Sequence, residues 1–412
     1  MSAQRIVSID AARSLGILAI ICIHTGPFLG AGFNATEDML AIIINQTAHC
    51  AVPFFFVAAG YFLAKKMATD RSPLRVAASY SGRLLAVFVF WSLAYVLVPP
   101  HMSIVKQHHY WEFTSARILA MLQDPMALVF EGTRGHLWFI VSLALAVWEI
   151  ALLAKIGQLR KLPYLAALLY VVGLLGGSYA TSPLGLDLHF NTRNGPFFGT
   201  LMVAIGWYIA RRRPAPSLRT AAGLAAIGVA LSVAEIAVLW KCLGVHPVRH
   251  DFLLGTAPLA AGLFLALLAR PNLGRNSGLP QLAQYSLGMY ACHVFFVDRW
   301  YRLKPPSANH VFELGFPLLV FGASLGVVWL LARSRFLRPF VTGAGIASRD
   351  RAVPPVVEAG AVPPFHFNQG RQRAGRAVDG DEVGLLVPSP LELQLPLLNA
   401  PLANHHAQRD AR

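Results

Sequence analysis

Residues 7–29 read VSIDAARSLGILAIICIHTGPFL, an apolar run long enough to cross a bilayer as one helix. Inside it lie Asp10, Arg13 and His24, and because ionisable groups are costly in a membrane, each is a candidate functional residue. At about 100° per residue, Arg13 and His24 differ by roughly 20° beyond three full turns, which predicts one shared helix face and a separation of about 16 Å along the axis. Asp10 lies about one turn before Arg13 and is expected to pair with it.

The end of the same run adds a second expectation. Pro27 lacks a backbone donor and is expected to free the carbonyl of Ile23, which would open the helix beside His24. On this run alone, His24 could equally be a structural histidine that bonds a neighbouring helix. The choice between the two roles depends on what the other helices bring near it.

The whole chain has the composition of a membrane protein. Of its 412 residues, 55% are hydrophobic and 13% are charged, whereas a soluble domain carries about 25% charged residues. A large soluble helical protein would show shorter apolar runs and amphipathic stripes. The sequence therefore predicts an all-α fold, a polytopic membrane helix bundle of about ten transmembrane helices, near residues 7–29, 42–63, 78–98, 137–154, 162–180, 195–210, 218–240, 252–269, 282–301 and 312–332.

Two segments are expected to lie outside the spans. Residues 110–131 contain Arg117, Asp124 and Pro125, which break the apolar face, so an interfacial or extracytoplasmic loop helix is predicted there. Residues 341–412 hold many prolines and no periodic apolar face, which predicts a disordered cytoplasmic tail. Residues 1–340 are thus predicted to form the integral membrane domain.

The net charge of +15 sets an orientation, because the basic residues lie in short clusters between apolar runs. This alternation places both termini in the cytoplasm and favours contact with anionic membrane lipid, and no nucleic acid partner is expected. The first and densest cluster could also bind an anionic cosubstrate such as the phosphates of coenzyme A. The clusters are Lys65, Lys66, Arg71, Arg75 and Arg83; Lys155, Arg160 and Lys161; Arg211, Arg212, Arg213 and Arg219; Arg270 and Arg275; and Arg333, Arg335 and Arg338.

With this orientation, polar residues of several helices fall at similar depth. His49, Glu235 and His293 lie in the outer halves of their spans, and His136 and Asn194 lie at outer mouths. The pattern predicts a cavity open to the outside, where side chains meet a hydrophilic acceptor, although each residue alone could be structural. The four cysteines lack the spacing of metal ligands, and no metal site is expected.

Four segments, in order, carry a resemblance to a known family. They are IDAARSLGILAIICIH at 9–24, with an arginine and a histidine separated by ten residues, VPFFFVAAGY at 52–61, HLWFI at 136–140 and YSLGMYACH at 285–293. Together they resemble the acyltransferase-3 integral membrane acyltransferases, over residues 5 to about 335. Two departures are that Ala58, Ala59 and Gly60 stand where a serine–glycine pair is common, and that His49 lies where arginine is frequent.

The resemblance implies an O-acetyltransferase of the bacterial cytoplasmic (inner) membrane, with residues 1–340 as the acyltransferase domain. Acetyl-CoA would be the acyl donor, and the acceptor a hydroxyl of a glycan or lipid-linked oligosaccharide. His24 would act as general base on that hydroxyl, or would first take the acetyl group itself. His293 or His136 would stabilise the thioester oxyanion. The residues expected to hold coenzyme A are Arg13, Arg71, Arg75 and Arg83, and Arg13 is also expected to be catalytic together with His24 and His293.

The resemblance leaves the acceptor and one rival function open. Exopolysaccharide, lipopolysaccharide O-antigen, an enterobacterial common antigen-like polymer and peptidoglycan all fit, and the segment from Cys22 to Phe28 favours exopolysaccharide by its similarity to acetylases of xanthan-type polymers. Glycan-assembly proteins are possible partners. A transporter or flippase of lipid-linked saccharides is the alternative, since it too would place polar groups inside a helix bundle.

Overall fold

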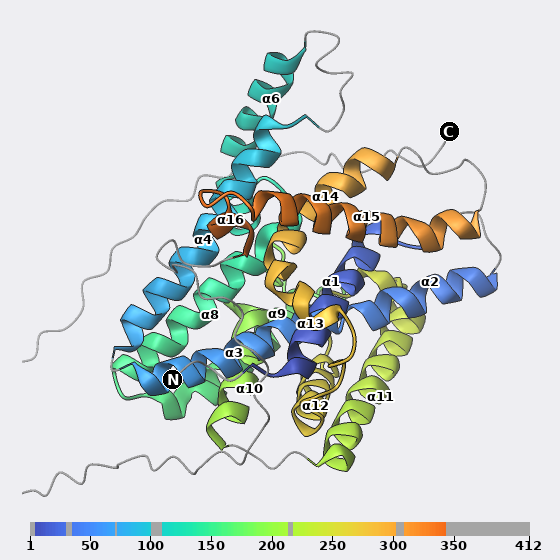
Figure 1. Ribbon diagram of the computed structural model, residues 1–412. Coiled ribbons are helices and arrows are strands. Elements are labelled where there is room, and N and C mark those ends of the chain that lie inside the picture. The colour runs from blue at the N-terminus through green and yellow to red at the C-terminus, as the bar shows by residue number, and fades with distance from the viewer. Residues whose placement is uncertain are drawn as a thin grey trace, which may run out of the picture. The chain divides into compact units, whose positions relative to one another are not determined.

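The computed structural model describes residues 5–29, 35–70, 72–99, 109–212, 217–301 and 309–342. All regular secondary structure in these ranges is helical, which confirms the all-α prediction (Figure 1). The predicted tail lies outside the described residues apart from its first two positions. The helices are α1 (Val7–Thr25), α2 (Ala35–Ala48), α3 (Ala51–Thr69), α4 (Pro73–Leu97), α6 (Tyr110–Gln123), α7 (Pro125–Glu131), α8 (Trp138–Lys155), α9 (Leu162–Leu175), α10 (Pro196–Arg212), α11 (Leu218–Leu243), α12 (Thr256–Ala269), α13 (Leu279–Leu282), α14 (Ser286–Trp300), α15 (His310–Leu331) and α16 (Arg338–Thr342).

Six helical stretches in the described ranges are long and apolar enough to cross a membrane. They are Val7–Thr25, Asp38–Thr69, Pro73–Leu97, Gly135–Lys155, Leu218–Leu243 and His310–Leu331. The other four predicted spans coincide with α9, α10, α12 and α14, which have 14 to 17 residues. Such helices cover about 21–26 Å, less than the roughly 30 Å of a hydrocarbon core. The polytopic bundle is therefore supported, whereas a total of ten spans stays a prediction.

The second predicted span, 42–63, is not one continuous helix. The chain turns at His49 and Cys50, between the end of α2 and the start of α3. Pro53 explains the break, because its ring would clash with the carbonyl of His49 in an unbroken helix, whereas a proline is tolerated in a first turn. The turn brings His49 to the inside of the bundle.

The first span also ends differently from the prediction. Helix α1 stops at Thr25, and Gly26 adopts a left-handed conformation at φ 55°, with its N–H bonded to Cys22 O at 3.0 Å. Glycine reaches this conformation without the steric penalty of a Cβ atom, so it ends the helix before Pro27 can distort it. His24 consequently lies in the last turn of α1, and the helix ends one residue after it, at Thr25, instead of continuing past a local opening at Ile23.

Helices α3 and α10 approach each other unusually closely. A Cβ atom added to Gly60 would lie 2.0 Å from Val203 O, and one added to Gly206 would lie 1.9 Å from Val57 O. Small residues allow membrane helices to pack backbone against backbone. Gly60, the glycine of the VPFFFVAAGY segment, therefore has a packing role that fixes α3 against α10.

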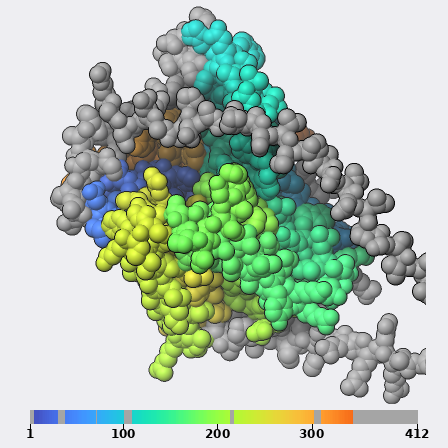
Figure 2. Space-filling model, turned by 180° about the vertical axis from the view of Figure 1, so that it is seen from behind, coloured from blue at the N-terminus to red at the C-terminus, as the bar shows by residue number. Residues whose placement is uncertain are grey.

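Helix α11 lies at the edge of the bundle, and α8 lies at its centre. The most apolar window of α11 is 11% buried, against 61% for the stretch that contains α8, and Figure 2 shows α11 in yellow-green at the surface. Helices α6 and α7 do not reach the length and apolarity of a span, as predicted for 110–131. They are interrupted at Asp124, whose Oδ1 accepts a bond from Ala127 N at 2.9 Å. Their exposed apolar side chains, such as Trp111 and Leu122, suit a membrane interface.

Candidate active site

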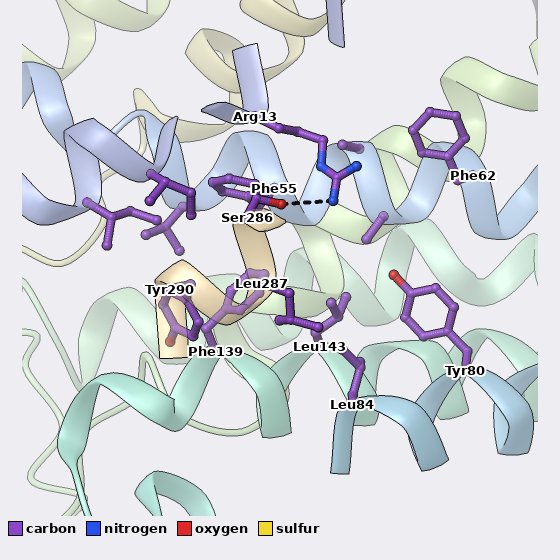
Figure 3. A pocket seen from close by; sticks show the side chains of 15 residues that line it. Arg13, Phe55, Phe62, Tyr80, Leu84, Phe139, Leu143, Ser286, Leu287 and Tyr290 are labelled. Atoms are coloured by element: carbon purple, nitrogen blue, oxygen red, sulfur yellow. Dashed lines mark hydrogen bonds between the residues drawn. The ribbon is translucent and has the colours of Figure 1, made fainter. Parts of the chain in front are cut away.

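Five helices, α1, α3, α4, α8 and α14, enclose a cavity of about 240 Å³, which we term the Arg13 cavity (Figure 3). Its lining is apolar except for Arg13, Tyr80, Ser286 and Tyr290. Ala58 and Ala59, at the departure from the family pattern, belong to the apolar lining. A mostly apolar cavity with a cation at one end suits an elongated ligand that carries a polar or anionic end.

Arg13 is held in place by residues from two helices. Its Nη2 donates to Ser286 Oγ at 2.9 Å, and its Nη1 lies 3.6 Å from Asp10 Oδ1, which confirms the predicted pairing. Ser286 in turn donates to Ala283 O at 2.8 Å, and Asp10 also accepts a bond from Arg5 at 2.5 Å. Figure 3 shows the Arg13 and Tyr80 side chains entering the cavity from α1 and α4.

The predicted coenzyme A residues of α4 differ in their relation to this cavity. Arg83 lies over the ring of Tyr80, with 5.9 Å between its Cζ atom and the ring centroid, and so adjoins the cavity lining. Arg75 is exposed in the first turn of α4 and does not line the cavity. Arg71 lies outside the described residues.

A second, smaller cavity of about 70 Å³ contains His24, and we term it the His24 cavity. Ile20, Val52, Phe139 and Tyr290 line both cavities, so the two adjoin at these four residues, which we call the neck. Arg13, Ile17 and Ile20 on α1 line the first cavity, and Ile20 and His24 line the second. The face predicted for Arg13 and His24 is therefore one continuous wall that runs along both cavities.

Three imidazole rings form a cluster at the His24 cavity. The ring centroids are 4.9 Å apart for His24 and His293, 5.2 Å for His136 and His293, and 6.0 Å for His24 and His136. His136 and His293 are buried, with 5% and 0% of their surface accessible, whereas His24 is exposed to the cavity. His24 and His136 both line the cavity, and His24 is the more exposed of the two.

Backbone carbonyls assign the protons of the two buried rings. His136 Nε2 lies 3.1 Å from Ala291 O, and His293 Nδ1 lies 2.6 Å from Tyr290 O, and a carbonyl can only accept. In the neutral rings, His136 Nδ1 and His293 Nε2 therefore carry lone pairs, and neither atom has a hydrogen-bond partner among the described residues. At these two atoms the neutral rings can only accept a hydrogen bond, and either ring would have to be protonated before it could donate to an oxyanion.

Two tyrosines fix the backbone that carries this cluster. Tyr290 donates its hydroxyl to His136 O. Tyr95 donates to Ala291 O at 3.0 Å, the same carbonyl that His136 uses, and accepts from Phe295 N at 3.1 Å. These bonds join α4, α14 and the turn before α8, so the two buried histidines are held on a rigid frame.

The sequence did not single out Arg193 or Asp251, which also line the His24 cavity. Arg193 Nη1 donates to Asp251 Oδ1 at 3.1 Å, and its Nη2 lies 3.9 Å from Glu131 Oε1. The guanidinium also lies over the ring of Trp138, 5.7 Å from its centroid. Only the position of Arg193 beside the predicted residue Asn194 hinted at its role, and Asn194 donates to Glu131 Oε1 at 2.7 Å.

Of the other predicted polar residues, His49 lines the His24 cavity and Glu235 does not. The two oxygens of Glu235 accept bonds from Leu254 N at 2.9 Å and Gly255 N at 3.0 Å, at the start of α12. The Tyr179 hydroxyl also donates to Glu235. A carboxylate that satisfies free N–H groups at a helix N-terminus has a structural role.

Comparison with known proteins gives a family match over nearly the whole described bundle. The model of the acyltransferase domain matches residues 6–333. An amino-acid racemase of Enterococcus faecalis is 28% identical over 213 residues, which make up 49% of this chain and 28% of that protein. A serine/alanine racemase of Enterococcus gallinarum is 24% identical over 339 residues, 79% of this chain and 46% of that protein.

The chain thus spans less than half the length of these curated relatives. No solved structure matches it. The family match contains all four segments quoted from the sequence, and residues of each segment line one or both cavities. The chain belongs to the acyltransferase-3 family, and its residues 6–333 form the acyltransferase domain of that family.

Proposed function

We propose that this enzyme transfers an acetyl group from cytoplasmic acetyl-CoA to a hydroxyl of a cell-surface or exported polysaccharide, or of its lipid-linked precursor. Exopolysaccharide is the favoured acceptor. The enzyme acts as a multi-pass protein of the bacterial cytoplasmic membrane with both termini in the cytoplasm, which puts the Arg13 end of α1 on the cytoplasmic side.

The pair of adjoining cavities between Arg13 and His24 is the observation that carries this proposal. A cavity of about 150 Å³ holds one benzene molecule, about 25 Å³ per non-hydrogen atom, so the 240 Å³ of the Arg13 cavity admits roughly ten such atoms. That is room for a large part of the pantetheine arm of coenzyme A. Arg13 and His24 are about 16 Å apart along α1, a distance that an extended pantetheine arm covers.

In this proposal the arm lies in the Arg13 cavity with its thioester at the neck. Arg13, held by Asp10 and Ser286, binds the polar end of the arm, and Arg83 lies beside the lining residue Tyr80. The nucleotide and its phosphates stay outside the cavity, near exposed Arg75. Arg71, which lies outside the described residues, stays a predicted ligand of the same phosphates. The thioester then reaches the depth of His24 while the acetyl group is still attached to coenzyme A, so no separate transfer of the acetyl group across the membrane is needed.

The transfer forms one carbon–oxygen bond and breaks one carbon–sulfur bond. His24 takes the proton from the acceptor hydroxyl while the hydroxyl oxygen attacks the thioester carbonyl carbon. When the tetrahedral intermediate collapses, the thiolate of coenzyme A leaves and receives the same proton from His24. The products are the acetyl ester and free coenzyme A, and proton and charge balance without a further reactant.

The buried histidines orient the base in this scheme. Because His136 Nδ1 and His293 Nε2 act as acceptors, either can take the N–H of His24, which leaves the other ring nitrogen of His24 as a lone pair facing the cavity. His293 is the nearer ring, at 4.9 Å between centroids. Arg193 is the cation of the His24 cavity lining and is our candidate for stabilising the oxyanion.

The lining of the His24 cavity also supports a carbohydrate acceptor. Trp138 offers an aromatic face, and Arg193 and Asp251 offer a cation and a carboxylate to hydroxyl groups. This mixture contrasts with the apolar wall of the Arg13 cavity. The racemase activity named for the longer relatives is not carried over, because at most 46% of either protein matches this chain.

The test compares O-acetyl groups on isolated surface and secreted polysaccharides, by proton NMR, in a deletion strain complemented with the wild type or with His24→Ala. The proposal is supported if the deletion strain loses the acetyl signal of one polysaccharide and if the wild-type enzyme, but not His24→Ala, restores it. The polysaccharide that loses the signal is then the acceptor. Polymer that is fully acetylated but reduced in amount would instead support the transporter alternative.

A further inference from the structure

The His24 cavity is too small for more than a short acyl group. By the same measure of about 25 Å³ per non-hydrogen atom, its 70 Å³ admits roughly three such atoms. An acetyl group has three non-hydrogen atoms, and each further methylene of a longer acyl chain needs about 25 Å³ more. The acyl chain points away from the sulfur, so when the thioester is at the neck its methyl end must lie in this cavity.

The apolar wall that this methyl group would meet is rigid. Phe198 of α10 lines the His24 cavity, and it is 2% exposed. Its ring packs at 5.4 Å from Phe56, 4.9 Å from Phe252 and 6.2 Å from Trp138, between ring centroids. The wall therefore has no free space behind it into which it could move.

The backbone beneath Phe198 is fixed as well. Ser142 on α8 donates to Gly195 O at 2.6 Å, one turn before Phe198. A Cβ atom added to Gly199 would lie 2.6 Å from Ser142 Oγ and 2.9 Å from the Phe56 ring, so α8, α3 and α10 meet at this point without a gap. Ile23, on the last turn of α1, completes the apolar lining beside His24.

We infer that Phe198 and Ile23 select the acyl donor by length, so that the enzyme transfers acetyl and rejects longer acyl groups. The inference rests on the proposed function, because it assigns the wall residues that meet the transferred group. The bonds made and broken are those of acetyl transfer, with hydroxyl oxygen replacing sulfur on the carbonyl carbon and the proton ending on the thiol. The donors differ only in the length of the alkyl chain beyond the carbonyl carbon, and this chain must fit into the His24 cavity.

The test uses membrane vesicles that carry the full-length enzyme, chemically de-O-acetylated polysaccharide from the producing strain, and radiolabelled acetyl-, propionyl- and butyryl-CoA. The measured quantity is the ratio of propionyl to acetyl transfer. One methylene in an apolar pocket changes selectivity by about 10- to 200-fold, so the wild type should transfer propionyl at least roughly tenfold more slowly than acetyl. Phe198→Leu and Ile23→Ala should each raise the ratio about tenfold.

Leu143→Ala is the matched control, because Leu143 lines only the Arg13 cavity and an equal apolar volume is lost there. Its ratio should equal that of the wild type. A wild type that transfers all three groups equally, wall variants with the wild-type ratio, or a Leu143→Ala shift as large as theirs would each overturn the inference while acyl transfer itself stands. Failure of every donor to label the polymer with the wild type would overturn the proposed function, and the inference with it.

Discussion

The two cavities differ in volume and in the polarity of their lining side chains, although a single wall of α1 runs along both. The Arg13 cavity is large and mostly apolar, and its polar lining gathers near Arg13, Tyr80 and Ser286. The His24 cavity is less than a third of that volume and is lined by three histidines, Arg193 and Asp251 among others. A large apolar space is suited to holding a flexible arm, whereas a small polar space is suited to orienting reacting groups. The comparison separates binding from chemistry along one helix.

His24→Ala should have the largest effect, and it tests whether chemistry at the His24 cavity is separate from coenzyme A binding at the Arg13 cavity. A positioned general base contributes about 10²–10⁴-fold, so acetyl transfer should fall by about three orders of magnitude. Binding of coenzyme A should stay near the wild-type value, because His24 does not line the Arg13 cavity. Transfer assays and isothermal titration on the detergent-solubilised enzyme give the two quantities. The exposed His189 supplies a control, His189→Ala, with unchanged transfer. Retention of transfer within about tenfold would remove His24 from the role of base.

Arg13→Ala should show the opposite pattern. The loss of hydrogen bonds made by a charged group costs about 1.5–3 kcal/mol, which corresponds to a rise in the KM for acetyl-CoA of roughly 10- to 150-fold. The kcat should change much less, because Arg13 is remote from the reacting bond. Arg13→Lys keeps the charge without the planar fork and should recover part of the loss. Steady-state kinetics at varied acetyl-CoA decide the matter, and an effect confined to kcat would contradict a binding role.

Tyr290→Phe tests the neck and should have a smaller effect. The variant keeps the ring that lines both cavities but loses the bond to His136 O. One neutral hydrogen bond is worth about 1 kcal/mol, so the kcat should fall about fivefold with little change in the KM for acetyl-CoA. Tyr95→Phe offers a comparison on the same frame, since it removes the bond to Ala291 O. A normal kcat in both variants would show that the frame does not need these bonds.

Glu235→Gln should leave transfer unchanged and should affect only stability. The amide keeps one acceptor for the two N–H groups at the start of α12, so the loss is about 1 kcal/mol. A drop in Tm of roughly 1–2 °C is expected for a chain of this size. Thermal unfolding in detergent measures it, with Glu112→Gln on the exposed face of α6 as the control. Loss of acetyl transfer in correctly folded Glu235→Gln would return Glu235 to the functional residues.

Much of the fold could be predicted because apolar run length and charge spacing are local properties of the sequence. Nine of the ten predicted spans each overlap one long helix, 42–63 overlaps two, and the Asp10–Arg13 pair follows from the helix repeat alone. The break before α3 was missed because the apolar run continues through it, and only the position of Pro53 marks the turn. The end of α1 was misjudged because Gly26, and not Pro27, decides where the helix stops.

The site was less accessible to sequence reasoning. His24, His136 and His293 were singled out separately as polar residues in apolar surroundings, but nothing local sets the distances between rings from three different segments. Arg193 and Asp251 lie between predicted spans, where charged residues are ordinary, and they pair across 58 positions of sequence. The proton positions of His136 and His293 depend on carbonyls that only the folded chain presents.

Because one wall of α1 runs along both cavities, the number of residues between Arg13 and His24 sets both the distance between these side chains and their relative orientation. One residue inserted between them would rotate His24 by about 100° and move it about 1.5 Å along the axis, away from His136 in the turn before α8 and His293 on α14. A substitution in the intervening segment disturbs only its own neighbours, but a change of length misaligns two sites at once. We therefore expect natural variants to differ in the side chains of this segment but to contain no insertions or deletions in it. The length of α1 between the two residues matches the length of the acyl donor to the position of the base.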